Sequence, residues 1–189
     1  RFVVGGVLGM KSFAERADLA QKARRALRKK YGKQSPEEGD DVVPQLLKFI
    51  LMEEAGEPAA EEAMKRIRDS FVDLNELRVS FPHEVAEVLP NIPHAEAKSR
   101  RATRLLNEVF LERNTLNWDF VRTMGVRELR QYFEKKSGGD AVLGAAAVLL
   151  FSSGHAVPAD ADVRRVLTRL KVVQKGEDLD AMHSFLERA

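Results

Sequence analysis

Side chains that could carry out catalysis or hold a metal are sparse in this sequence. The four histidines have no His-x-x-x-His or similar ligand spacing, so the pattern predicts no metal site. They are His83, His94, His155 and His183. Cysteine is absent, which excludes a disulfide framework, a thiolate nucleophile and a cysteine-held iron–sulfur cluster. We therefore expect a protein without a metal or other cofactor.

Motifs for nucleotide binding and for paired acid–base chemistry are also missing. No Gly-x-x-x-x-Gly-Lys-Ser/Thr loop occurs, and the glycines at positions 5, 6 and 9 precede no strand–helix unit. Two acidic pairs, Glu53–Glu54 and Glu61–Glu62, are adjacent in sequence and face different directions on a helix. We interpret both pairs as solvated charges.

Charged residues are distributed unevenly over the first third of the chain. The whole sequence has 31 Lys/Arg and 29 Asp/Glu, a net charge of +2. Residues 1–31 carry nine Lys/Arg against two Asp/Glu, whereas residues 32–62 carry two against nine. The basic segment is suited to binding a polyanion, and it is equally suited to pairing with the acidic segment that follows it. Both alternatives stay open at the level of sequence.

Helical periodicity predicts an all-α fold of about ten mostly short helices, because no stretch alternates with the period of a strand. The expected helices cover residues 13–31, 42–55, 58–72, 73–79, 82–89, 118–124, 126–136, 141–151, 161–170 and 177–187, with a further long helix from residue 93. The helices 42–55 and 141–151 are too apolar for a surface position, so we expect them in the core.

Local signals indicate where several helices begin and which faces are polar. Ser12 and Glu15 form a capping-box signature. Three aspartates are expected as N-caps, namely Asp73, Asp140 and Asp160. The first helix has apolar residues on one face, at Phe13, Ala17, Ala20, Ala23, Leu27 and Tyr31. On the long helix from residue 93, the cations expected to lie mainly outward are Lys98, Arg100, Arg101 and Arg104.

The length and hydropathy pattern suit one globular domain. We expect residues 1–10 to form a flexible segment and residues 11–189 to form a single helical domain. The longest apolar run, 141–151, has 11 residues, whereas a membrane-spanning helix needs roughly 18–20. We therefore expect no membrane partner and a cytoplasmic location.

The segment from Val126 to Leu170 contains the most informative pattern in the chain. A helix is followed by the turn Ser137-Gly138-Gly139-Asp140, a very apolar helix, a short loop and a charged helix. This order resembles the helix-hairpin-helix family of base-excision DNA glycosylases, and endonuclease III in particular. In that family the loop leads into Val-Asp-Thr-His-Val-x-Arg-Val-x-x-Arg-Leu. The residues that match it at the same spacing are Asp160, Val163, Arg165, Val166, Arg169 and Leu170, with Asp162 in place of the histidine.

Two upstream stretches extend the resemblance to roughly residues 13–188. Residues 45–52 lie where the family has a buried helix before a Ser-Ala-Gln loop, and residues 92–98 resemble its Ile-Gly-x-x-x-x-Lys-Ala element. The resemblance implies two helical lobes. One would cover about 42–137 with the hairpin 126–151, and the other would combine 11–31 with 152–189.

The resemblance also implies contacts to DNA. In the family, backbone N–H groups of the hairpin hold a DNA phosphate at the start of a helix. The corresponding glycines are Gly138 and Gly139, and the nearby cations are Lys135, Lys136, Lys98 and Arg101. The family's Leu-Pro-Gly-Val-Gly spelling is lost, and Asp140 is expected to cap the same donors and to repel a phosphate.

Departures from the family pattern affect catalysis most. Bifunctional members use a lysine just inside the second hairpin helix to form a Schiff base with the sugar. Gly144 occupies that position, and no lysine occurs from residue 137 to residue 170. The family's base-gap glutamine falls near Glu54 or Ala55, and the cysteine cluster loop is absent. Asp160 matches the family aspartate and is the candidate catalytic residue, although an Asp before a helix also serves as a cap.

The leading hypothesis is therefore a double-stranded DNA-binding protein that resembles base-excision repair glycosylases, lacks AP-lyase activity and need not be catalytic. Two alternatives stay open. One is a residual monofunctional glycosylase that uses Asp160. The other is a helical protein-interaction module whose basic and acidic segments pair with each other or with a protein partner. If the chain is instead an unrelated helical bundle or repeat protein, Val163, Val166 and Leu170 are expected to form a buried stripe. The oligomeric state does not follow from the sequence.

Overall fold

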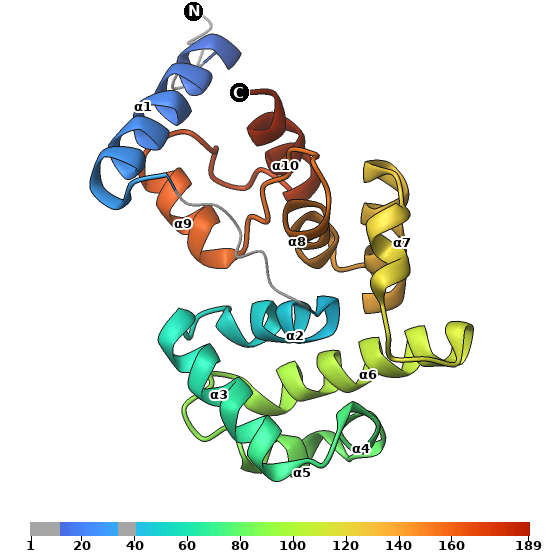
Figure 1. Ribbon diagram of the computed structural model, residues 1–189. Helices are drawn as coiled ribbons and strands as arrows, with labels where there is room; N and C mark the ends of the chain where they lie inside the picture. The colour runs from blue at the N-terminus through green and yellow to red at the C-terminus, as the bar shows by residue number, and fades with distance from the viewer. Residues whose placement is uncertain (1–11, 34–40) are drawn as a thin grey trace, which may run out of the picture. The chain divides into compact units, whose positions relative to one another are not determined.

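The computed structural model describes residues 12–33 and 41–189, apart from the side chain of Asp180, and every regular element in them is helical (Figure 1). The expected all-α fold is confirmed, while the segment 1–10 lies outside the described residues. The elements are α1 Phe13–Tyr31, α2 Val42–Met52, α3 Glu57–Ser70, α4 Leu74–Val79, α5 Pro82–Glu87, α6 Ala95–Arg113, the 3-10 helix η1 Asp119–Thr123, α7 Val126–Ser137, α8 Ala141–Phe151, α9 Ala161–Arg169 and α10 Leu179–Arg188.

The chain divides into two compact units, which we describe separately. The larger unit spans residues 36–160 and contains α2 to α8. The smaller unit combines residues 1–35 with residues 161–189, so that it contains α1, α9 and α10. Residues 152–160, expected in the second lobe, belong to the larger unit. In the part of the chain that the structure describes, no helix has the length and apolar character needed to cross a membrane.

The core of the larger unit forms around its two most apolar helices. On α2, Leu46, Leu47 and Ile50 are at most 1% exposed, and on α8 the alanines at 145, 146 and 147 are fully buried. α2 packs against α3, α6 and α8. Burying each Leu or Ile side chain contributes roughly 1.5–3 kcal/mol before entropy is subtracted. The expectation that helices 42–55 and 141–151 lie in the core is confirmed.

In the larger unit, α7 packs tightly against α8 at Gly144. A Cβ atom on Gly144 would lie 2.5 Å from Cγ of Glu134 and 2.9 Å from the carbonyl oxygen of Arg130. Because Arg130 contributes backbone at this contact, only glycine lets the two helices approach so closely. The position that the family resemblance aligns with a lysine therefore has no room for any side chain.

The predicted caps of three helices are present. Ser12 and Glu15 form the complete capping box of α1. Asp73 accepts a hydrogen bond from the Glu76 N–H at 2.9 Å, and Asp140 accepts one from the Leu143 N–H at 3.0 Å. These caps depend on residues three apart, which is why the sequence predicts them well.

Some helix boundaries differ from the prediction. α2 ends at Met52 rather than at residue 55, because Glu54 and Gly56 adopt positive φ angles of 58° and 80°. α6 begins at Ala95 rather than at residue 93, after His94 at φ 55°. Residues 118–124 form only the short 3-10 helix η1. A residue in the left-handed backbone conformation interrupts a helix. When that residue is not glycine, the sequence does not predict the interruption reliably.

In the smaller unit, the first half of α1 is held by a buried arginine. Arg16 donates from Nε to the carbonyl oxygen of Val172 at 2.7 Å, and from Nη2 to the carboxylate of Glu177 at 2.8 and 2.7 Å. The rings of Phe13 and Phe185 meet edge to face with centroids 5.2 Å apart. These contacts fix the N-terminal part of α1 to the segments around α10.

Other apolar positions of the smaller unit are exposed. Leu27 and Tyr31 of α1 are 59% and 58% exposed, although they belong to the apolar face of that helix. α9 buries none of its residues, and Val166 and Leu170 are each 46% exposed. The interpretation of Val163, Val166 and Leu170 as a buried stripe is therefore wrong for Val166 and Leu170.

Candidate functional site

The turn between α7 and α8 requires glycine at two successive positions. Gly138 and Gly139 have φ angles of +85° and +97°, which are favourable only for glycine. The Gly138 N–H donates to the carbonyl oxygen of Lys135 at 3.2 Å, and the Gly139 N–H donates to that of Glu134 at 2.7 Å. These hydrogen bonds close the last turn of α7. Both glycines are exposed.

An arginine from α6 packs directly against this turn. A Cβ atom on Gly138 would lie 2.6 Å from Nη1 and 2.7 Å from Cζ of Arg104. Arg104 is exposed, and none of the described residues forms an ion pair with it. We expected Arg104 to face outward, but nothing in the sequence indicates that it meets the hairpin, because α6 and the turn are far apart along the chain.

Arg101 links the hairpin to the end of α2. Its guanidinium forms hydrogen bonds of 2.5 and 2.9 Å with the carboxylate of Glu53, and it also pairs with the carboxylate of Asp140. Burial lowers the pKa of Arg101, but the hydrogen bonds and charges of Glu53 and Asp140 outweigh burial and raise it overall. Arg101 thus offsets part of the negative charge of Asp140, which the sequence predicts to repel a phosphate, and the same guanidinium also serves Glu53. Glu53 is likewise not the solvated charge that the sequence predicts.

Lys98 is buried, so the expectation that it lies outward is wrong. The residue is 3% exposed, and its Nζ donates to the carbonyl oxygens of Leu51, at 3.1 Å, and of Glu53. The last carbonyls of α2 have no partner within the helix, so a buried cation there satisfies both hydrogen bonding and the helix dipole. Burial lowers the pKa of Lys98. The negative charges of Glu53 and Glu54 act in the opposite direction but do not outweigh burial. A side chain in this position does not reach a ligand in solution.

The two lysines at the end of α7 differ. Lys136 forms an ion pair with Glu112 at 2.6 Å and donates to the carbonyl oxygen of Glu108 at 3.1 Å. The hydrogen bond from Lys136 lowers the pKa of Glu112. Lys135 is exposed, and no described residue forms an ion pair with it. Of the cations predicted beside the turn, Lys135 is therefore the one that the fold leaves available.

Asp160 is the last residue of the larger unit and is partly buried. It interacts with other residues, so it is not a free carboxylate. Within the described residues, no group of three or more His, Asp or Glu side chains is arranged to hold a metal ion.

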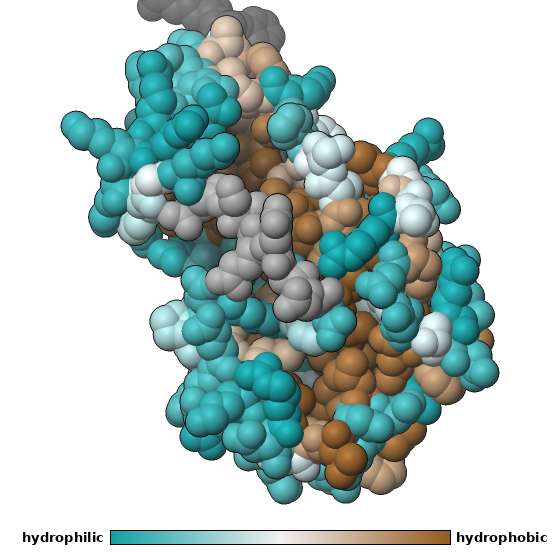
Figure 2. All heavy atoms as spheres, in the orientation of Figure 1, coloured by the Kyte–Doolittle hydropathy of each residue, from teal (hydrophilic) through white to brown (hydrophobic). Residues whose placement is uncertain are grey.

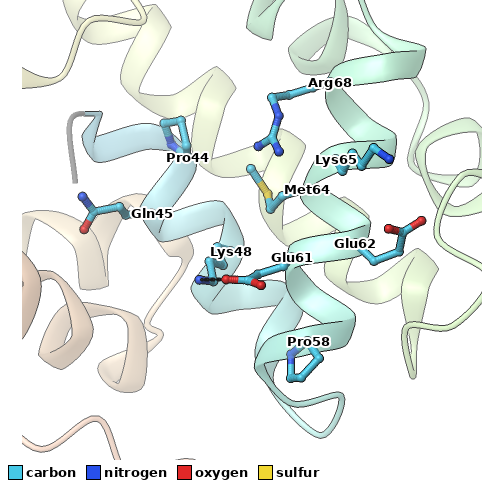
Figure 3. Close-up of a pocket in the computed structure, with 9 residues that line it drawn as sticks. All are labelled: Pro44, Gln45, Lys48, Pro58, Glu61, Glu62, Met64, Lys65 and Arg68. Carbon is cyan, nitrogen blue, oxygen red and sulfur yellow. Dashed lines mark hydrogen bonds and ion pairs between the residues drawn. The ribbon is translucent and has the colours of Figure 1, made fainter. Parts of the chain in front are cut away.

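A separate groove of about 550 Å³ lies between α2 and α3 (Figure 3). Lys48 extends from α2 toward α3 and forms an ion pair with Glu61 at 3.0 Å (Figure 3). It forms a second ion pair with Glu57 at 3.2 Å. Burial lowers the pKa of Lys48, but these glutamates outweigh burial and raise it overall. The lining residues include no histidine and no hydroxyl side chain, and the raised pKa keeps the Lys48 amine protonated, so it is not a ready nucleophile.

No family model and no curated protein matches the chain.

Proposed function

We propose that the protein binds the phosphate backbone of double-stranded DNA through a hairpin surface formed by Gly138, Gly139, Lys135 and Arg104. The observation that carries the proposal is the position of the Arg104 guanidinium against Gly138, in a turn whose two glycines have positive φ angles. A guanidinium offers several N–H donors in a fixed geometry that suits phosphate oxygens. A Cβ atom on Gly139 would meet nothing within 4 Å, so a phosphate can approach the backbone there, beside the Arg104 guanidinium that covers Gly138.

The charges around the turn support the same function. Lys135 and Arg104 are exposed cations, whereas the carboxylate of Asp140 is held in an ion pair by Arg101. The surface offers contacts to phosphates but no set of side chains aimed at base edges, so binding would be weakly sequence-specific and would weaken steeply with salt. The resemblance to helix-hairpin-helix glycosylases points to the same ligand. AP-lyase activity is not part of the proposal, because Gly144 has no room for a nucleophile.

The proposal is tested by fluorescence anisotropy with a labelled 20-base-pair duplex, titrated with the full chain at several salt concentrations. The double variant Arg104→Gln/Lys135→Gln should bind several-fold more weakly. Each lost phosphate contact should reduce the slope of log K against log[salt] by about 0.9. The matched control, Lys65→Gln/Arg68→Gln, removes two exposed cations from α3 and should bind as the wild type does.

Equal binding by the double variant and the control would contradict the proposed surface. If the wild type does not bind DNA at micromolar concentration, the alternative of a helical protein-interaction module is favoured instead.

A further inference from the structure

The second half of α1 carries a dense group of exposed cations. We call residues 22–33 the basic segment, and Figure 2 shows hydrophilic residues over α1 in the view of Figure 1. The basic segment contains Lys22 and six further cations, and those six are all exposed. They are Arg24, Arg25, Arg28, Lys29, Lys30 and Lys33. Cations at a helix C-terminus are favourable, but the dipole is equivalent to only about half a unit charge, so it does not balance this many.

The described glutamates of the acidic segment that follows α1 all pair with basic side chains of their own larger unit. The pairs are Glu53 with Arg101, Glu54 with His94, Glu57 and Glu61 with Lys48, and Glu62 with Arg66. Within the described residues, Lys22 of the basic segment forms an ion pair with Asp18 at 2.6 Å. Of the two alternatives left open by the charge pattern, these pairs favour an external polyanion.

The arrangement of the cations favours nucleic acid over a membrane surface. Arg24 and Arg28, like Arg25 and Lys29, are four residues apart and therefore lie about 6 Å apart along one side of the helix. Duplex DNA presents a phosphate charge about every 1.7 Å of its axis, so several cations on one face can each find a phosphate. A helix that lies in a membrane interface needs a broad apolar face. The exposed half of α1 has only Leu27 and Tyr31 as large apolar side chains.

We propose that the basic segment is a second DNA-backbone contact, separate from the hairpin surface. The choice of DNA as the polyanion rests on the proposed function, but the two surfaces share no residue and can be tested independently. The first half of α1 is held by Arg16 and Phe13, so substitutions in the basic segment leave the attachment of the helix intact.

The test uses anisotropy titrations of the full chain with a labelled 20-base-pair duplex between 50 and 300 mM salt. The basic-segment variant is Arg24→Gln/Arg25→Gln/Arg28→Gln/Lys29→Gln, and glutamine keeps good helix propensity. The matched control loses the same charge from exposed cations elsewhere and is Lys65→Gln/Arg68→Gln/Arg169→Gln/Lys175→Gln. Circular dichroism confirms that both variants are folded.

The basic-segment variant should bind at least tenfold more weakly at low salt than the control. Its slope of log K against log[salt] should fall by up to about 3.6, which is about 0.9 for each of the four lost contacts. If the basic-segment variant has the same affinity and salt slope as the control, the inference is overturned. This holds even if Arg104→Gln/Lys135→Gln weakens binding, a result that would support the hairpin surface alone. The reverse pattern would support the basic segment and contradict the hairpin surface. Binding of the wild type to phosphatidylserine/phosphatidylcholine vesicles but not to DNA would overturn both.

Discussion

Arg101 of α6 holds the carboxylate of Asp140, the residue that caps α8, and the same guanidinium binds Glu53 at the end of α2. One cation thereby joins three helices of the larger unit and offsets part of the charge of the carboxylate nearest to the hairpin turn. Arg104 and Lys135 add exposed positive charge beside the same turn.

Replacing Arg101 should destabilise the fold. In Arg101→Gln, two carboxylates that are each 18% exposed lose their cation. We expect the free energy of unfolding to fall by about 1–3 kcal/mol, because removing one partner leaves the others incompletely paired. Urea denaturation followed by circular dichroism measures the change. The control is Arg100→Gln, which breaks an exposed pair with Glu96 and should cost less than about 0.5 kcal/mol. Equal losses in the two variants would contradict a joining role for Arg101.

A methyl group at Gly144 should separate α7 from α8. Gly→Ala inside a helix usually stabilises by roughly 0.5–1 kcal/mol. At Gly144 the added Cβ would lie 2.9 Å from the Arg130 carbonyl oxygen, so Gly144→Ala should destabilise by about 1–3 kcal/mol. Thermal or urea unfolding gives the sign directly. Gly125→Ala, where a Cβ meets nothing within 4 Å, should change stability by less than about 1 kcal/mol. A stabilising Gly144→Ala would show that the two helices are not so close.

The pair formed by Glu112 and Lys136 should make stability depend on pH. The hydrogen bond from Lys136 lowers the folded-state pKa of Glu112 below its ordinary value of 4.5. This contribution is therefore present above pH 4.5 and is lost as the pH falls through the lowered pKa. Glu112→Gln should be less stable than the wild type at pH 7, and the difference should shrink below pH 4.5. Urea unfolding at several pH values tests this. A difference that does not vary with pH would refute it, and exposed Glu128→Gln is the control.

The sequence predicts what depends on neighbouring residues and misses what depends on distant ones. The caps at Ser12, Asp73 and Asp140 and the apolar helices of the core are correct because each follows from a short pattern. Lys98 is wrong because helical periodicity does not reveal that the carbonyl groups ending α2 need a donor from α6.

The same limit applies to the candidate site and to α1. Gly138, Gly139 and Lys135 follow from the turn pattern, but the contact of Arg104 with Gly138 joins residues 34 positions apart and leaves no local signal. On α1, periodicity identifies the apolar face but not how far along the helix other segments cover it. Leu27 and Tyr31 are exposed for that reason.

The chain should not form a covalent intermediate with an abasic site. Borohydride trapping requires an amine nucleophile that forms an imine with the opened sugar. The chain has no lysine from residue 137 to residue 170, and Gly144 is packed against α7. Incubation with abasic-site DNA and borohydride should therefore give no covalent complex, and strand cleavage should stay at the uncatalysed background. Detection of an adduct by denaturing gel electrophoresis would show that another amine, such as Lys135, acts as a nucleophile.

The most direct test of DNA binding at the hairpin surface is an NMR titration of the ¹⁵N-labelled full chain with a short unlabelled duplex at low salt. The account predicts that the amide signals of Gly138 and Gly139 and the Nε–H signal of Arg104 shift as DNA is added. The shifts should saturate and should reverse as salt is raised, because the contacts are to phosphates. If the duplex saturates the protein while these three signals stay in place, DNA is bound elsewhere and the central claim is wrong.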